Sequence, residues 1–353
     1  MTEQSAAPPQ APEIVPGGDA RSPVHLGFRA WIAVLKRIWV MNDFHGLALL
    51  AAGMAFYAFL AFVPAIAALV LAYGLIGDPV LVAQHMETVF ALVPAGAAEI
   101  IREQLLAIVT ANSGVTGIGL VVALFFAIFG AMRASGASIQ ALNIIYEEHE
   151  SRSLLGAYGT SAALTLGAIL LGLVGIAAAS VFAWLANAGE SLGPGMRIAG
   201  QIATWLLAAL LASIAFAAVY RYAPDRREAK WRWITLGSVA ATLLWIGASV
   251  GFGLYAAYVA NYNATYGSLG AIVALLMWLW LTSYAVLIGG LVNAESERQT
   301  FRDSTVGPDR PIGERGAQMA DNQSLDAASI YLLEKRRRRE ADRKARRRLF
   351  SSR

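Results

Sequence analysis

The side chains that could do chemistry in this chain are few and scattered. The 353 residues include no cysteine, which removes disulfides, thiolate metal ligands and thiol nucleophiles. The histidines lie in unrelated segments, at His25, His45, His85 and His149. The densest acidic run, 147–150, has adjacent residues that point in different directions, and it is typical of a solvated loop. The sequence therefore predicts no catalytic residue, no metal site and no cofactor.

Polar residues also follow a long apolar stretch, where they could bind a ligand. Helical character continues from Val115 to Tyr146, about 48 Å at the standard rise, which exceeds a ~30 Å hydrocarbon core. The spacing of Arg133, Gln140 and Asn143 predicts that they share one helix face near the inner interface. Polar groups at such depth line pathways or bind lipid headgroups. The alternative is that Arg133 extends to the interface and only marks the membrane boundary.

Pro64, near the middle of the first apolar stretch, is a further candidate feature. Proline removes a backbone hydrogen bond, so we expect a kink, which either acts as a hinge or cavity wall or only shapes packing. The candidate lipid or substrate pathway comprises Pro64, Arg133, Gln140, Asn143 and Tyr146.

Six long apolar stretches must position these residues. Hydrophobic residues make up 57% of the chain and charged residues only 15%, unlike a typical soluble protein. Each stretch is long enough to cross a bilayer as a helix, and none has Asp, Glu, Lys or Arg in its interior. The sequence predicts an all-α, polytopic membrane bundle of six transmembrane helices. They are Gly46–Ile76, Val115–Met132, Leu154–Ala186, Ile198–Tyr220, Trp233–Tyr258 and Leu269–Val292.

Lysine and arginine indicate the orientation of the bundle. They gather in the N-terminal segment, the second and fourth loops and the C-terminal tail. The first loop has only Arg102, the third only Arg197, and the fifth has none. Because cytoplasmic loops accumulate these residues, both termini are predicted to be cytoplasmic.

The chain divides into four predicted parts. Residues 1–23 are expected to be a disordered tail, since they lack the layout of a cleaved signal peptide. Residues 24–45 fit either an interfacial amphipathic helix or a plain helical lead-in. Residues 46–297 form the transmembrane domain, including a helical hairpin at 78–111 on the outer face. Residues 298–353 form a basic cytoplasmic tail that begins with a flexible linker over 302–323.

Small residues suggest where the helices approach each other closely. Gly247 and Gly251 are four apart in the fifth stretch, and Gly167, Gly172 and Gly175 recur in the third. Small residues let membrane helices pack tightly, so close contacts are predicted at these positions.

The C-terminal tail carries a dense basic cluster, which attracts anionic surfaces. Anionic lipid at the cytoplasmic leaflet is the favoured partner, and the alternative is a solvated tail that enforces topology. Nucleic acid is not expected, because no aromatic residues are interleaved for stacking. The candidate lipid contacts are Lys335, Arg336, Arg337, Arg338, Arg339, Arg343, Lys344, Arg346, Arg347 and Arg348.

Several segments resemble the YihY/BrkB-type family of bacterial inner-membrane proteins, once labelled ribonuclease BN. Their order and spacing carry the resemblance over residues 31–297, and they include Ala55-Phe56-Tyr57, Ala141-Leu142-Asn143, Tyr222-Ala223-Pro224-Asp225, Tyr266-Gly267-Ser268-Leu269-Gly270 and Asn293-Ala294-Glu295. The resemblance implies six helices, no established enzyme chemistry and a proposed involvement in lipid handling at the envelope. Ribonuclease activity is not expected, since a positioned metal or acid–base cluster is lacking in the sequence.

These observations leave two classes of function. The favoured one is non-enzymatic handling or transport of lipid or another amphiphile, with membrane lipids as partners. The alternative is a scaffold or regulatory protein that binds a periplasmic or other envelope protein or forms a homo-oligomer. An ion-coupled pump is less favoured, because no acid or histidine lies in a span to relay protons or cations.

Overall fold

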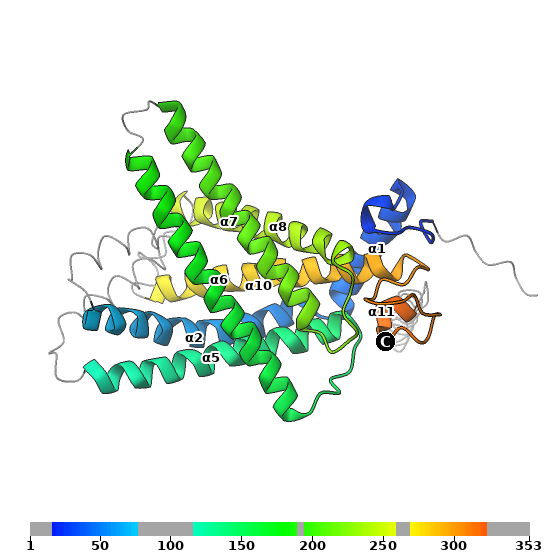
Figure 1. Cartoon of the computed structure of the whole chain (residues 1–353), viewed down its shortest axis with the longest axis horizontal. Helices are drawn as coiled ribbons and strands as arrows, with labels where there is room; N and C mark the ends of the chain where they lie inside the picture. The colour runs from blue at the N-terminus through cyan, green and yellow to red at the C-terminus, as the bar shows by residue number, and fades with distance from the viewer. Residues whose placement is uncertain (1–15, 77–115, 189–193, 259–268, 323–353) are drawn as a thin grey trace, which may run out of the picture.

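A computed structural model describes residues 16–76, 116–188, 194–258 and 269–322, and the ordered elements are helices (Figure 1). The all-α prediction is confirmed. In the described part of the chain, extended pairing is limited to the bridge between Ala229 and Thr305. The elements are η1 (Pro23–His25), α1 (Phe28–Phe44), α2 (Leu47–Ile76), α5 (Thr116–Ile145), α6 (Leu154–Ala188), α7 (Pro194–Tyr222), α8 (Trp231–Tyr258), α10 (Leu269–Arg298) and α11 (Gln318–Asp321).

The long helices are apolar enough to cross a membrane. By length and composition there are five candidate spans in the described residues, or six if α1 and the first part of α2 form one bent span. The apolar side chains on these helices are largely exposed, as is expected of surfaces that contact lipid. Each predicted stretch corresponds to one helix among α2, α5, α6, α7, α8 and α10. The predicted outer hairpin, 78–111, and the basic cluster, 335–348, lie outside the described residues.

The helices form a core group and a crossing pair. Helices α2, α5, α8 and α10 run side by side, while α6 and α7 lie across them as an antiparallel pair (Figure 1). Helix α2 packs chiefly on α5, and α10 packs on both α8 and α2. Helix α10 is therefore the central element of the bundle.

A sharp bend separates α1 from α2. The two helices meet at 63°, and Gly46 between them has φ 64°, a conformation that glycine adopts without steric cost. Helix α1 buries Val34 and Met41 and exposes Trp39. Farther along, α2 continues through the half-buried Pro64 to Ile76 as one helix.

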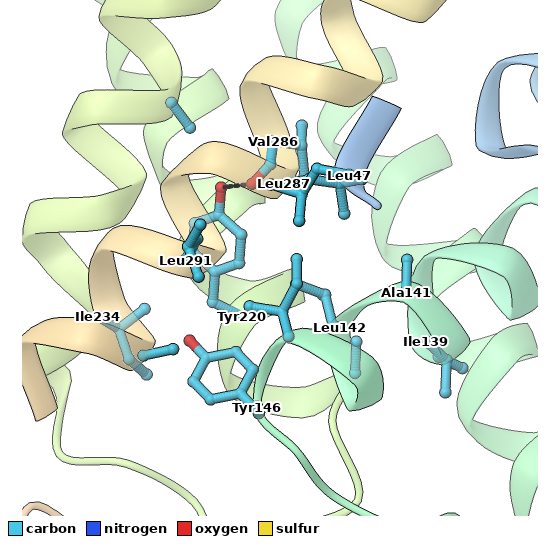
Figure 2. Packing of buried hydrophobic residues seen from close by; sticks show 14 of the residues in the cluster. Leu47, Ile139, Ala141, Leu142, Tyr146, Tyr220, Ile234, Val286, Leu287 and Leu291 are labelled. Atoms are coloured by element: carbon cyan, nitrogen blue, oxygen red, sulfur yellow. Dashed lines mark hydrogen bonds between the residues drawn. The ribbon is translucent and has the colours of Figure 1, made fainter. Parts of the chain in front are cut away.

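The buried core lies toward one end of the bundle. Tyr146 follows α5, Tyr220 belongs to α7, and Leu287 and Leu291 belong to α10; all four side chains are almost fully buried (Figure 2). The Tyr220 hydroxyl donates a 2.6 Å hydrogen bond to the carbonyl oxygen of Val286, so its polar group is satisfied inside the core.

Close helix contacts occur at glycines that the sequence pattern did not select. The predicted close packing at Gly247 is wrong, because a Cβ placed there would meet no described atom within 4 Å; the same holds for Gly167, Gly172 and Gly251. A Cβ on Gly237 of α8 would instead overlap the carbonyl oxygen of Gly289 of α10. A Cβ on Gly130 of α5 would lie 2.7 Å from the Ala61 Cα of α2.

The substitution Gly237→Ala should destabilise the protein by about 1–3 kcal/mol, because the methyl group overpacks the contact between α8 and α10. The matched control, Gly247→Ala in the same helix, should be neutral or stabilising by up to about 1 kcal/mol, since it adds helix propensity in open space. Thermal unfolding in detergent measures both effects. Equal stability of the two variants would contradict the close approach.

Candidate functional site

Charged side chains gather at one end of the bundle, and α10 carries several of them into its interior. We call this region the charged end: residues 147–152, 225–230 and 295–298. Glu295, Glu297 and Arg298 on the last turns of α10 are at most 4% exposed. Buried charges are expensive unless they are paired, so their partners decide whether this arrangement is stable.

Each of these α10 residues has an ion-pair partner from another segment. Arg37 of α1 contacts Glu295 at 2.7 Å, and Arg226 after α7 contacts Glu297 at 2.7 Å. Arg298 lies 2.7 Å from Glu147, which follows α5. The charged end therefore ties α1, α5 and the segment between α7 and α8 to α10.

Helix α5 ends in a turn that presents Glu147 to Arg298. Glu147 has φ 55°, a left-handed conformation that is uncommon for residues other than glycine. The Glu148 amide donates to the carbonyl oxygen of Asn143 at 2.8 Å, which closes the last turn. The ion pair with Arg298 gives a physical reason for this conformation of Glu147.

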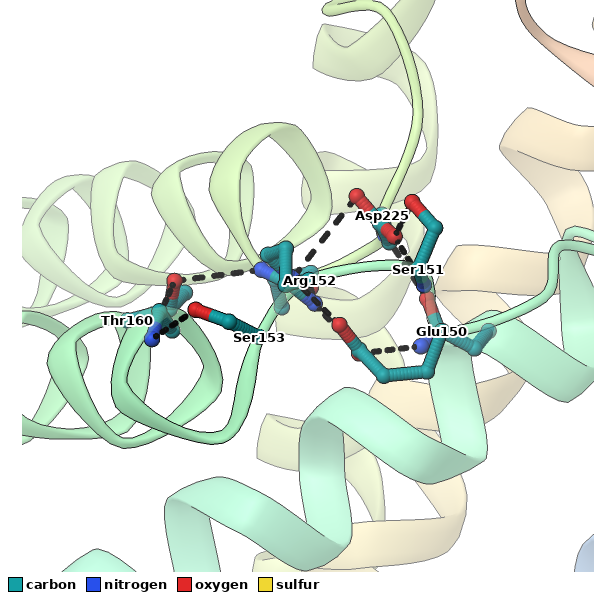
Figure 3. A network of polar contacts seen from close by, with 9 residues as sticks. Glu150, Ser151, Arg152, Ser153, Thr160 and Asp225 are labelled. Atoms are coloured by element: carbon teal, nitrogen blue, oxygen red, sulfur yellow. Dashed lines mark hydrogen bonds and ion pairs between the residues drawn. The ribbon is translucent and has the colours of Figure 1, made fainter.

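A second polar network joins the loop before α6 to the loop after α7 (Figure 3). The Arg152 guanidinium donates to both carboxylate oxygens of Glu150, at 2.6 and 2.7 Å. The Ser151 amide and hydroxyl both donate to Asp225 at 2.6 Å. Asn143 bridges the two loops, since its amide donates to Glu150 and its oxygen accepts from the Asp225 amide.

The acidic run is only in part the solvated loop that the sequence predicted, because Glu150 is exposed whereas Glu147 and Glu148 are partly buried. Glu147 pairs with Arg298, Glu150 pairs with Arg152, and Glu148 accepts a 2.7 Å hydrogen bond from the Gln318 amide. These partners lie far away in the sequence, except for Arg152, so local spacing could not reveal them.

The segment 302–322 is likewise not a flexible linker. Arg315 is buried and donates to the carbonyl oxygens of Phe301 and Ala320, at 2.6 and 2.8 Å. Residues before α1 also pack here, because the Thr300 hydroxyl forms hydrogen bonds with the carbonyl oxygens of Gly18 and Ala20. Residues 16–23 of the predicted N-terminal tail thus pack against residues 299–302, next to the charged end, whereas residues 1–15 lie outside the described part.

The surroundings of the acids in the two loops shift their pKa values in different directions. Burial raises the pKa of Glu148 to about 7. The hydrogen bond from Arg152 lowers the pKa of Glu150, which stays ionised near neutral pH. Burial alone would raise the pKa of Asp225, but hydrogen bonds from Ser151 and the charge of Arg152 lower it. Among the described residues, no group of three or more His, Cys, Asp or Glu is placed to hold a metal ion.

A groove of about 300 Å³ opens beside this network, between α2, α5 and the start of α6. Its apolar walls include Met132, Ile139, Leu154 and Ala157. The polar or aromatic side chains that line it are Tyr57, Arg133, Gln140, Glu150, Tyr158 and Ser161. The groove can therefore hold an amphiphilic ligand, and its polar lining offers one cation, one acid and several neutral groups.

The predicted pathway residues divide between the groove and the core. Arg133 and Gln140 line the groove and are exposed. Asn143 is buried and turned toward the α7–α8 loop, and Tyr146 is buried with Arg226 5.0 Å from its ring centroid. Pro64 is not among the groove-lining residues. Glu150, which reasoning from the sequence missed, joins the groove to the polar network.

The fold and the charged end define a polytopic helical membrane protein. The family described as "Virulence factor BrkB" matches residues 39–312, most of the chain, and the protein belongs to this family. The predicted family resemblance is thereby confirmed.

Several bacterial proteins share about three residues in ten with this chain over the segments that match. The putative ribonuclease-like protein YfkH of Bacillus subtilis is 31% identical over 193 residues, which covers 52% of this chain and 66% of YfkH. The UPF0761 membrane protein IL2447 of Idiomarina loihiensis is 29% identical, covering 60% of this chain and 72% of IL2447. A UPF0761 membrane protein of Nitrosospira multiformis is 31% identical, but the match covers only 41% of its length. No solved structure matches the chain.

The raised pKa of Glu148 predicts a pH-dependent stability. Its ordinary value is 4.5, so between about pH 4.5 and 7 the folded protein holds a proton that the unfolded chain has lost. Stability should therefore fall as the pH rises through this window. Glu148→Gln should remove this dependence and stabilise the protein near pH 8 by an amount of the order of 1 kcal/mol, given screening by solvent at a partly exposed site.

Thermal unfolding at a series of pH values measures this effect. Glu314→Gln, which changes an exposed acid in the segment 302–322, is the matched control, and its stability should vary with pH as that of the wild type does. A Glu148→Gln variant that is less stable than the wild type at high pH would contradict the assignment.

Proposed function

We propose that this protein binds and handles a membrane amphiphile, with the groove between α2, α5 and α6 as the binding site. The observation that carries the proposal is the pairing of an apolar wall with the exposed cation Arg133 in one open groove. Ligand sites combine largely apolar walls with a few placed polar groups, and a lipid has matching parts. We place this activity in the bacterial inner membrane, with the charged end facing the cytoplasm.

The lipid-facing character of the surrounding surface supports this proposal. Leu154 and Leu155 at the start of α6 are 80% and 86% exposed, and Phe129 on α5 is also exposed. An acyl chain in the groove would thus meet apolar side chains both inside and outside it. This continuity would let the ligand exchange with the bilayer without crossing a polar rim.

The proposed handling involves no catalysed reaction. Glu150 is the acid in the groove, and its hydrogen bonds from Arg152 keep it ionised, so it is poorly suited to donate a proton. Its Oε2 atom also accepts from the Asn143 amide, which further holds the carboxylate in place. The basic cluster at 335–348 is proposed to add contact with anionic lipid at the same side of the membrane.

Filling the groove should strongly reduce lipid retention. Ala157→Trp places an indole in the groove wall, and retained lipid should fall about tenfold, which corresponds to ~1.4 kcal/mol of binding free energy. Native mass spectrometry with lipid analysis of the gently extracted protein measures the amount retained. Gln140→Trp fills the groove from an exposed position and provides a second test if Ala157→Trp does not fold.

The matched control is Ala163→Trp, on the exposed surface of α6 outside the groove. It should retain as much lipid as the wild type. Equal lipid retention by folded groove variants and this control would contradict the proposal. A protein partner that copurifies in constant ratio with all of them would then favour the scaffold alternative.

A further inference from the structure

Arg133 differs from most arginines at and around the charged end, and this difference points to a ligand. Most of them pair with a carboxylate within the protein, as Arg37, Arg152, Arg221, Arg226 and Arg298 do. Arg133 has no acidic partner among the described residues, although it lines a groove with an apolar wall. Its guanidinium carbon lies 5.3 Å from the ring centroid of Phe129, one turn earlier on α5.

Glu150, the acid that lines the same groove, is not an ion-pair partner of Arg133. Glu150 lines the same groove, but both of its oxygens accept hydrogen bonds, from Arg152 and Asn143. Glu150 pairs with Arg152 at 2.6 Å, and Arg152 also lies 3.7 Å from Asp225, so these charges are held together in the polar network. Arg133 is therefore a groove cation without a carboxylate in direct contact among the described residues, and an anionic group of a ligand is the complement of its charge.

Aromatic side chains extend from Arg133 along the same face of α5. Phe129 lies one turn before Arg133, and Phe125 lies one turn before Phe129. The rings of Phe125 and Phe129 are stacked with their centroids 6.3 Å apart, and both are substantially exposed. This row leads from the cation into the apolar span, so one ligand could place an anion at Arg133 and an acyl chain along the rings.

We infer that the groove recognises the phosphate of a membrane phospholipid, with Arg133 as the phosphate-binding residue and the Phe129–Phe125 row as the contact for an acyl chain. This inference deepens the proposed function and depends on it. A guanidinium offers a planar fork of donors that matches two phosphate oxygens, unlike the point charge of lysine. Stacking on Phe129 holds that fork in place before the ligand binds.

Competition between lipids that share their acyl chains, with and without a phosphate headgroup, tests the inference. The full-length protein is equilibrated with equal amounts of dioleoyl phosphatidylglycerol, dioleoyl phosphatidylethanolamine and dioleoylglycerol in mixed micelles, and native mass spectrometry counts the retained molecules. Wild type should retain both phospholipids in preference to dioleoylglycerol. Arg133→Gln should lower the phospholipid-to-dioleoylglycerol ratio about fivefold without lowering retention of dioleoylglycerol itself. Arg133→Lys should fall between them.

Arg232→Gln is the matched control, since Arg232 is an exposed arginine on α8 that does not line the groove. Its ratio should equal that of the wild type. An unchanged ratio in Arg133→Gln, or an equal fall in Arg232→Gln, would overturn phosphate recognition by Arg133. Retention of phosphatidylglycerol alone would show attraction to net charge and overturn it too. Displacement of phospholipid by excess inorganic phosphate would assign the site to a soluble phosphate instead.

These outcomes are distinct from failure of the proposed function. If Ala157→Trp strongly reduces retention of all three lipids while Arg133→Gln leaves their ratio unchanged, the result supports amphiphile binding in the groove and contradicts phosphate recognition by Arg133. If wild type retains none of the lipids above the level of Ala157→Trp, both the proposed function and this inference fail.

Discussion

The pairing of buried charges around the last turns of α10 is the constraint on which the rest of the structure depends. Charged groups are expensive in hydrocarbon, and the apolar spans exclude them. Glu295, Glu297 and Arg298 nevertheless lie inside the protein, just beyond the apolar part of α10. Loss of one partner of such a pair typically costs about 3–5 kcal/mol, because the other charge stays buried and unpaired. Arg37, Arg226 and Glu147 must therefore reach α10 together.

This requirement also positions the groove. Arg226, in the segment between α7 and α8, pairs with Glu297 of α10. The residue before it, Asp225, accepts hydrogen bonds from Ser151. Arg152 then contacts Glu150 at the edge of the groove and the Thr160 hydroxyl within α6. A continuous set of polar contacts thus runs from the buried end of α10 to the start of α6. The placement of α6 against α5, which forms the groove, follows from contacts at the charged end.

The sequence predicts the helices, but it does not predict the contacts between them. The apolar runs predicted every long helix, because a ~20-residue apolar stretch in lipid must satisfy its own backbone. Glycine spacing did not predict packing, since Gly237 and Gly289 meet across helices whereas the Gly247 and Gly251 pattern faces outward. Spacing within one helix says which residues share a face, but not which helix that face meets.

The candidate site was predicted in part for the same reason. Arg133 and Gln140 lie two turns apart on α5, so their shared face was visible in the sequence and both line the groove. Asn143 instead forms hydrogen bonds with Glu150 and with the Asp225 amide in the loop network. Because these partners come from separate segments, spacing along α5 could not predict this role. The Gly- and Pro-containing stretch before residue 323 is typical of a linker in composition, yet Arg315 anchors it through hydrogen bonds to the carbonyl oxygens of Phe301 and Ala320.

A structure of the protein in lipid nanodiscs, determined by electron cryomicroscopy, tests the central claim most directly. The account predicts non-protein density in the groove between α2, α5 and α6, with a headgroup against Arg133 and an acyl chain along Phe129. The same structure should retain the contacts of Glu295 and Glu297 with Arg37 and Arg226. A groove closed by movement of α6 onto α5, with Arg133 directed into solvent and no lipid density beside it, would contradict the account.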